Sequence, residues 1–146
     1  MGRARGGRDD DDVADDGTAP VRVLVVDDQA PFRLAARAVV SRTPGFEHVG
    51  DAETGEAAVV LVSELTPDLV LMDINMPGID GLEATRRLLV ESPDTVVFLC
   101  STYAREDLPD DAVATGATAY VNKEELGPDV LRDLWSRRQE AEGSLL

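Results

Sequence analysis

The feature that most constrains the fold is an alternation, repeated five times, of short apolar runs with longer segments of helical spacing. The apolar runs lie at 21–26, 68–73, 95–100 and 118–123, and a weaker strand candidate lies at 47–52. The segments of helical spacing lie at 29–43, 55–65, 81–92, 106–116 and 128–141. Strands that are apolar on both faces and separated by helices predict a parallel sheet with helices on both sides. The fold class is therefore α/β.

The ordered domain is expected to cover residues 20–141. Residues 1–19 hold three arginines, six aspartates and almost nothing apolar, so they cannot offset the entropy of ordering and are predicted to be a disordered tail. Residues 142–146 are a short C-terminal tail. Within the domain, the segment 106–116 predicts only a short, weakly supported helix, with Pro109 in its first turn.

Composition excludes several classes of function. A formal net charge of −15 argues against direct binding to a nucleic-acid backbone, and it favours a divalent cation or a basic partner. The single cysteine, Cys100, rules out an intramolecular disulfide and is expected in the core. The lone His48 cannot form a histidine metal cluster. No apolar run reaches the ~18 residues of a membrane helix, and a signal peptide is missing, so we expect a soluble, cytoplasmic protein with no membrane partner.

Polar side chains follow four of the five predicted strands, where function collects in an open parallel sheet. They are Asp27, Asp28, Asp73, Asn75, Ser101, Thr102 and Lys123. Each has a simpler explanation when taken singly: Asp27 or Asp28 could cap the next helix, and Lys123 could be a surface residue. Their joint placement at successive strand ends is what indicates a functional site.

Three carboxylates in one place need a compensating charge. At ~5 Å and an effective dielectric near 20, each pair repels by roughly 3 kcal/mol. The site is therefore expected to raise a carboxyl pKa or to bind a cation. Mg²⁺ suits it best, because it prefers oxygen ligands and shares its remaining positions with phosphate oxygens. Lys123 would supply a second positive charge beside the metal.

Four stretches of the sequence, "VLVVDDQ", "LVLMDINMPGIDG", "VVFLCST" and "AYVNK", together resemble the receiver domain of two-component response regulators. The resemblance covers about residues 20–140. It implies the flavodoxin-like, doubly wound five-stranded parallel sheet, with strand order 2-1-3-4-5 and five helices.

The resemblance also implies a role for each site residue. Asp73 would be the phosphoacceptor. Asp27, Asp28 and Asp73, with the backbone carbonyl of Asn75, would hold Mg²⁺. Ser101, next to Thr102, would bond the phosphoryl group and Lys123 would pair with it.

Three further assignments follow from the same resemblance. Tyr120 would be the aromatic switch residue that turns inward when Ser101 moves. Asn75 and Tyr103 would line the path of water to the phosphoryl group and so tune dephosphorylation. Thr102 stands where the family usually has a smaller residue, and its methyl group is expected to slow closure over the phosphoryl group.

The implied function is that of a signalling phosphoacceptor, an enzyme only toward its own phosphorylation and dephosphorylation. A histidine kinase or phosphotransfer protein would be the donor, and the switched state would change binding to a downstream protein or drive homodimerisation. One departure is "KEEL" after strand five, since most receivers follow this lysine with proline. No DNA-binding output domain follows in this sequence, so a stand-alone receiver is expected, with a receiver cut from a longer regulator as the alternative.

Three rival interpretations remain open from the sequence. The first is a degenerate receiver that signals without phosphate, although all five chemical positions are present. The second is a flavin- or nucleotide-binding module, but "DDQAPF" offers two acids and no glycine where phosphate would sit. The third is a phosphatase of the haloacid dehalogenase type, which needs a second acid where Asn75 stands.

Overall fold

A computed structural model of the chain describes residues 19–141. The tails expected at 1–19 and 142–146 lie outside these described residues, except for Ala19. The strands and helices described below fall within residues 20–141, and the domain boundaries themselves stay a prediction.

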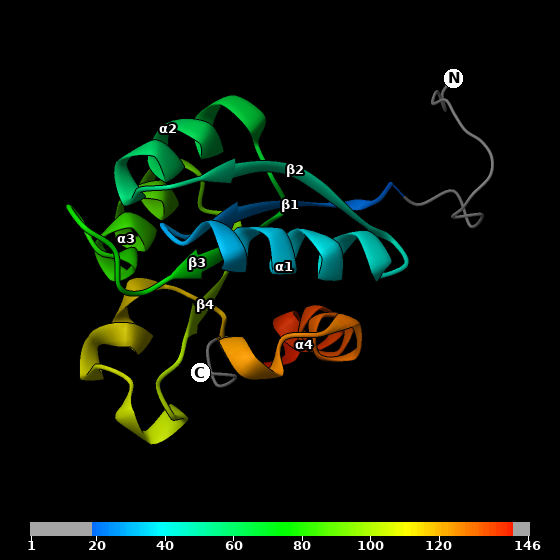
Figure 1. The fold of residues 1–146 in the computed structure, drawn as a ribbon. Coiled ribbons are helices and arrows are strands. Elements are labelled where there is room, and N and C mark those ends of the chain that lie inside the picture. The colour runs from blue at the N-terminus through cyan, green and yellow to red at the C-terminus, as the bar shows by residue number, and fades with distance from the viewer. Residues whose placement is uncertain (1–18, 142–146) are drawn as a thin grey trace.

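Five parallel strands form one sheet in the order β2-β1-β3-β4-β5 (Figure 1). The strands are β1 (Val21–Val26), β2 (Phe46–Ala52), β3 (Leu69–Asp73), β4 (Val96–Ser101) and β5 (Ala119–Asn122). All five expected strands are present to within a residue or two, and the order implied by the resemblance is confirmed.

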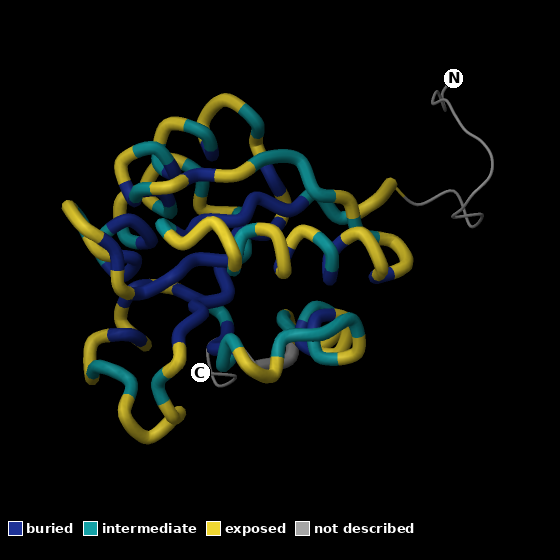
Figure 2. Tube along the Cα trace, viewed as in Figure 1, coloured by how far each residue is buried: buried dark blue, intermediate teal, exposed yellow. Residues whose placement is uncertain are grey.

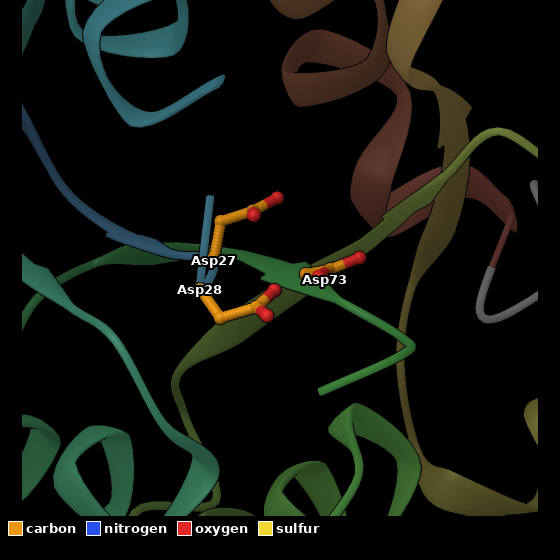
Figure 3. A group of neighbouring side chains, drawn as sticks. All are labelled: Asp27, Asp28 and Asp73. Carbon is orange, nitrogen blue, oxygen red and sulfur yellow. The ribbon is translucent and has the colours of Figure 1, made fainter. Parts of the chain in front are cut away.

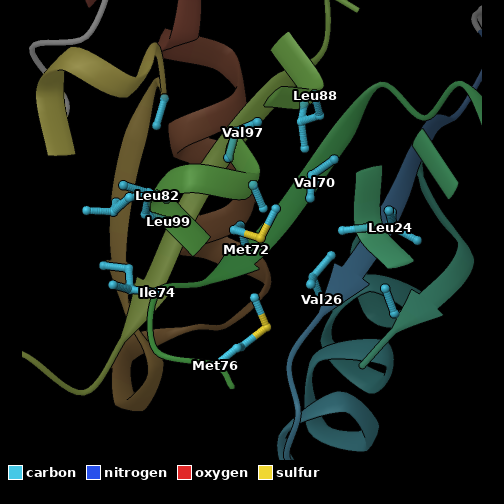
Figure 4. Close-up of a cluster of buried hydrophobic side chains, with 14 of the residues drawn as sticks. Leu24, Val26, Val70, Met72, Ile74, Met76, Leu82, Leu88, Val97 and Leu99 are labelled. Atoms are coloured by element: carbon cyan, nitrogen blue, oxygen red, sulfur yellow. The ribbon is translucent and has the colours of Figure 1, made fainter. Parts of the chain in front are cut away.

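Successive residues of each central strand enter opposite cores, because side chains alternate between the two faces of a sheet. On one face, Leu24, Val70 and Leu99 pack with α2 (Gly55–Leu65) and α3 (Gly81–Glu91), as Figure 4 shows. On the other face, residues such as Val25 and Phe98 pack with α1 (Ala30–Arg42) and α4 (Pro128–Ala141). The sheet is thus buried on both sides, while exposed segments lie mainly in the outer helices and loops (Figure 2).

Local signals fix the ends of the helices next to the site. The side chain of Thr54 accepts a hydrogen bond from Ala57 N (3.0 Å) at the start of α2, and that of Asp80 accepts one from Glu83 N (2.9 Å) at the start of α3. Helix α2 ends at Thr66, which adopts a left-handed conformation with φ 44°. These caps orient both helices relative to the loop that follows β3.

The segment 106–116 differs from expectation in the kind of helix it forms. Instead of an α-helix it contains two 3₁₀ segments, η1 (Arg105–Asp107) and η2 (Asp110–Thr115), separated at Leu108 and Pro109. Of these two segments only Ala112 and Thr115 are buried. A proline and so few packing contacts leave the backbone without the tertiary support that a longer α-helix needs.

Candidate functional site

Neighbouring strands bring three carboxylates together at the carboxyl edge of the sheet. Val26, the last residue of β1, pairs with Met72 of β3. The residues that come next in the chain, Asp27 and Asp73, therefore lie side by side. Asp28 follows directly. One carboxylate oxygen from each of the three aspartates lies within 4.8 Å of the other two (Figure 3).

Asp27 is the most deeply buried of the three acids and is fully shielded from solvent. Its Oδ1 accepts a hydrogen bond from Gln29 N at 2.7 Å. Its Oδ2 accepts no hydrogen bond of ordinary geometry and lies 2.6 Å from Lys123 Nζ. A buried carboxylate without a partner is costly, and the ammonium group of Lys123 supplies the opposite charge beside this oxygen.

Asp73 lies at the tip of β3 with 4% of its surface exposed. Burial raises its pKa to about 6, and the negative charge of Asp27 adds to the rise. Lys123, whose Nζ lies 3.3 Å from Asp73 Oδ1, and a hydrogen bond from the Asn75 backbone act in the opposite direction on this pKa. A further positive charge near Asp73 would therefore stabilise its ionised form.

Lys123 is the first residue of η3 (Lys123–Glu125), immediately after β5. Burial lowers its pKa, but the close contact with Asp27 and the charges of both carboxylates outweigh burial and leave the pKa raised. Its ammonium group also lies 4.6 Å from the centre of the Phe32 ring. The lysine is thus fixed between two acids and an aromatic face as a permanent positive charge.

The three aspartates fit a divalent cation by the chemistry of their donors. All are carboxylate oxygens, which Mg²⁺ prefers, and the cluster is partly open because Asp28 is only half-buried. Lys123 supplies one positive charge against three negative ones. The residues present are therefore suited to hold Mg²⁺, with Asn75 beside them on the exposed loop after β3.

The two hydroxyl residues at the end of β4 differ in burial. Ser101 is the last residue of β4 and is buried, and its Oγ accepts a hydrogen bond from Tyr103 N at 3.3 Å. Thr102 is exposed. Tyr103 is partly buried, and its ring packs against the core under α2 and α3. That packing supports the simpler interpretation of Tyr103 as a loop anchor, and its effect on water access stays a prediction.

Tyr120 is turned inward in this structure, with 2% of its surface exposed. Its hydroxyl lies 3.0 Å from Ser101 O and 2.5 Å from Tyr103 O. The aromatic residue assigned as the switch is therefore already bonded to the loop that carries the site hydroxyl.

Two features that support the site were not found from the sequence. Gly81 begins α3 so close to the site that a Cβ there would lie 2.0 Å from Asp73 O, which only glycine avoids. Glu56 of α2 reaches the loop after β3, where its carboxylate accepts a hydrogen bond from Ile79 N at 3.3 Å. Neither Gly81 nor Glu56 stands in a distinctive sequence pattern, so only their tertiary contacts identify them as part of the site's support.

Cys100 behaves as the sequence indicates. Cys100 is buried, and burial raises the pKa of its thiol to about 12, so it is a core residue. Among residues 19–141, no helix is both long and apolar enough to span a membrane.

Residues 23–134 match the model of the response regulator receiver domain, which is most of the chain. The chain is 40% identical over 104 residues to the transcriptional regulatory protein DegU of Brevibacillus brevis, covering 71% of this chain and 44% of that protein. It is 41% identical over 103 residues to the response regulator GacA of Pseudomonas aeruginosa, covering 70% and 48%. The chain thus spans less than half the length of these curated relatives.

Solved structures agree with the sequence relatives. The response regulator domain of Thermotoga maritima CheB matches with a TM-score of 0.73 and 29% identity, over 82% of this chain and 97% of that one. The signal receiver domain of the putative response regulator NarL from Mycobacterium tuberculosis matches with a TM-score of 0.75 and 27% identity, over 84% and 98%. With the sheet order, the acid cluster and the matched family model all in agreement, this chain belongs to the response regulator receiver family.

Proposed function

We propose that this receiver domain accepts a phosphoryl group on Asp73 from a histidine kinase or phosphotransfer protein. The observation that carries the proposal is the contact of one buried carboxylate, Asp73, with a fixed ammonium, Lys123, inside a cluster of three acids. A structural ion pair needs only one acid for one lysine. Two additional carboxylates are costly to the fold unless a cation and a phosphoryl group are bound there.

The proposed reaction is an in-line displacement at phosphorus. A carboxylate oxygen of Asp73 forms the new P–O bond while the P–N bond of a phosphohistidine breaks, and the departing imidazole takes up a proton. Asp73 has to be ionised to attack, and with a pKa of about 6 it is mostly ionised at neutral pH. Lys123, beside Asp73, stabilises negative charge on the transferring oxygens.

Mg²⁺ is the proposed cofactor, held by Asp27, Asp28, Asp73 and the backbone carbonyl of Asn75. When bound, it would offset the repulsion between the carboxylate nucleophile and the anionic phosphoryl oxygens. The charge balance of the site supports this assignment, because Lys123, the cation paired with Oδ2 of buried Asp27, leaves the cluster of three acids with excess negative charge.

The product would act as a switch through the loop after β4. Ser101 would donate its hydroxyl hydrogen to the phosphoryl group, Lys123 would pair with it, and Thr102 would move with the same loop. Tyr120 would respond, since its hydroxyl bonds to the backbone of that loop. Asn75 and Tyr103 are proposed to set how quickly water hydrolyses the acyl phosphate.

The proposed output is protein binding. The switched state would change binding to a downstream protein or promote homodimerisation, in a cytoplasmic setting. The formal net charge of −15 disfavours direct contact with nucleic acid. That this chain works without an attached output domain stays a prediction, because the curated relatives are about twice as long.

The proposal is tested by incubating the purified chain with acetyl phosphate, with and without Mg²⁺, and measuring its intact mass. We expect one added phosphoryl group, dependent on Mg²⁺ and released by hydroxylamine. Asp73→Asn should lose it because an amide is a poor nucleophile, whereas Asp94→Asn, an exposed acid in the turn before β4, should keep it. A hydroxylamine-sensitive label at full yield in Asp73→Asn would exclude this phosphoacceptor.

A further inference from the structure

The backbone carbonyl of Tyr103, just after β4, receives hydrogen bonds from two side chains of β5. Tyr120 Oη lies 2.5 Å from this oxygen, and Asn122 Nδ2 donates to it at 3.0 Å. A carbonyl oxygen has two lone pairs, so both are occupied. The loop that begins with Ser101 is therefore held against β5 by two side chains.

The side chain of Asn122 also accepts a hydrogen bond from the turn that follows β5. Its Oδ1 accepts a hydrogen bond from Glu124 N at 2.9 Å and caps η3, the turn that begins with Lys123. The two partners fix the orientation of the amide, because the flipped arrangement would set its NH₂ against an N–H and its oxygen against a carbonyl. One side chain thus joins the turn of Lys123 to the loop of Ser101.

The position of Asn122 makes this link direct. Asn122 pairs with Ser101 in the parallel ladder of β4 and β5, and Lys123 is its immediate neighbour. Ser101 and Lys123 are the two groups proposed to bond the phosphoryl oxygens. A change in the bond between Asn122 and the Tyr103 carbonyl therefore alters the position of the hydroxyl relative to the ammonium.

From these contacts we infer that Asn122 is a positioning residue, which holds the hydroxyl loop in register with Lys123 and so sets the affinity for the phosphoryl group. The inference rests on the proposed function and adds a determinant to it. Within residues 19–141, the side chain of Asn122 bonds to Tyr103 and Glu124, so it acts on the loop and leaves the carboxylates unchanged.

The test measures binding of beryllofluoride, a stable phosphoryl mimic, in the presence of saturating Mg²⁺, together with binding of Mg²⁺ alone. Two variants of Asn122 separate its two bonds. Asn122→Ser keeps an N-cap acceptor for η3 but is too short to reach the Tyr103 carbonyl. Asn122→Ala loses both bonds. Gln139→Ser, an exposed amide on α4, is the matched control.

We expect Asn122→Ser and Asn122→Ala to weaken beryllofluoride binding to a similar extent, by about five-fold, as for one lost hydrogen bond. Binding of Mg²⁺ alone should stay within about two-fold of wild type in both, and only Asn122→Ala should also lose thermal stability through its cap. Adding Tyr120→Phe, which removes the second donor to the same carbonyl, should give an effect that differs from the product of the two single effects.

Unchanged beryllofluoride affinity in Asn122→Ser, with wild type binding normally, would overturn this inference and leave the proposed function intact. Equal losses of Mg²⁺ and beryllofluoride affinity would also overturn it, because they would indicate a general distortion of the site. A wild-type chain that binds no beryllofluoride would overturn the proposed function and the inference together.

Discussion

At the scale of single residues, the site is a place where the fold carries an electrostatic cost. Asp73 is buried beside Asp27, and burial and the neighbouring charge together raise its pKa to about 6. Lys123 compensates only in part, since it is one cation among three acids. Such a conflict between stability and local charge is what a binding site for a cation and a phosphoryl group would resolve.

This cost predicts how stability depends on pH without metal. The folded-state pKa of Asp73, about 6, lies above the ordinary aspartate value of 3.8, so the folded state prefers the protonated acid. Wild type should match Asp73→Asn in stability below pH about 4 and fall behind it as the pH rises through about 6, by a deficit on the order of 3 kcal/mol. Denaturant unfolding of both proteins in chelator, at a series of pH values, measures this difference. A constant difference across that range would contradict the shifted pKa.

Tyr103 gives a second prediction at this scale. Its partly buried ring lies on the loop directly after the site hydroxyl. If the ring shields the phosphoryl group from water, Tyr103→Ala should shorten the lifetime of the acyl phosphate several-fold without weakening Mg²⁺ binding. The rate of phosphate release from the phosphorylated chain measures this lifetime. An unchanged or longer lifetime would mean that the ring only anchors the loop.

At the scale of elements, the strands were predictable because each carries its own signal. The runs from Val21 and from Leu69 are apolar on both faces, and their patterns needed no tertiary information. The segment 106–116 was predicted less well, because its helical periodicity is weak and Pro109 interrupts it. There the choice between α and 3₁₀ geometry depends on packing that the sequence does not display.

The acid cluster, like the strands, was predictable because its residues carry a local sequence signal. Acids at the tips of β1 and β3 must meet once the strands are parallel neighbours, so Asp27 and Asp73 could be placed together in advance. The cation–π contact of Phe32 with Lys123 and the two-sided bonding of Asn122 could not. Both link residues through side-chain rotamers, and a pattern of residue types does not specify these.

Helix α1 carries the third prediction. Its residue Leu34 is 66% exposed. The preceding residue, Arg33, donates a hydrogen bond to Asp27 O at 2.7 Å. An exposed leucine on the helix that begins after the acids of β1 suits contact with a protein that delivers the phosphoryl group. Leu34→Asp should slow transfer from a phosphohistidine protein by about ten-fold and leave acetyl phosphate labelling unchanged.

The matched control for α1 is Val90→Asp, because Val90 of α3 is 82% exposed and lies near the end of that helix, away from its site-facing start. It should transfer at the wild-type rate. Equal slowing by both variants, or slowing of the acetyl phosphate reaction by Leu34→Asp, would remove α1 as the docking surface.

At the scale of the whole molecule, charge and metal binding are coupled to folding. The chain has a formal net charge of −15, and the acid cluster joins β1 to β3 at the centre of the sheet. A ligand that binds only the folded state stabilises it by mass action. Mg²⁺ should therefore raise the melting temperature at pH about 7 and have little effect at pH about 5, where Asp73 is largely protonated. Thermal unfolding at the two pH values measures this difference. An equal rise in melting temperature at both pH values would argue against a multi-carboxylate site.

The central claim is that Asp73, and not a neighbouring acid, receives the phosphoryl group. Borohydride reduces an acyl phosphate of aspartate to homoserine, so the modified position can be identified by peptide sequencing in a mass spectrometer. After phosphorylation by a phosphohistidine protein in Mg²⁺, we predict homoserine at position 73 alone. Homoserine at Asp27 or Asp28, or a phosphoryl group that resists borohydride on Ser101, would contradict the account.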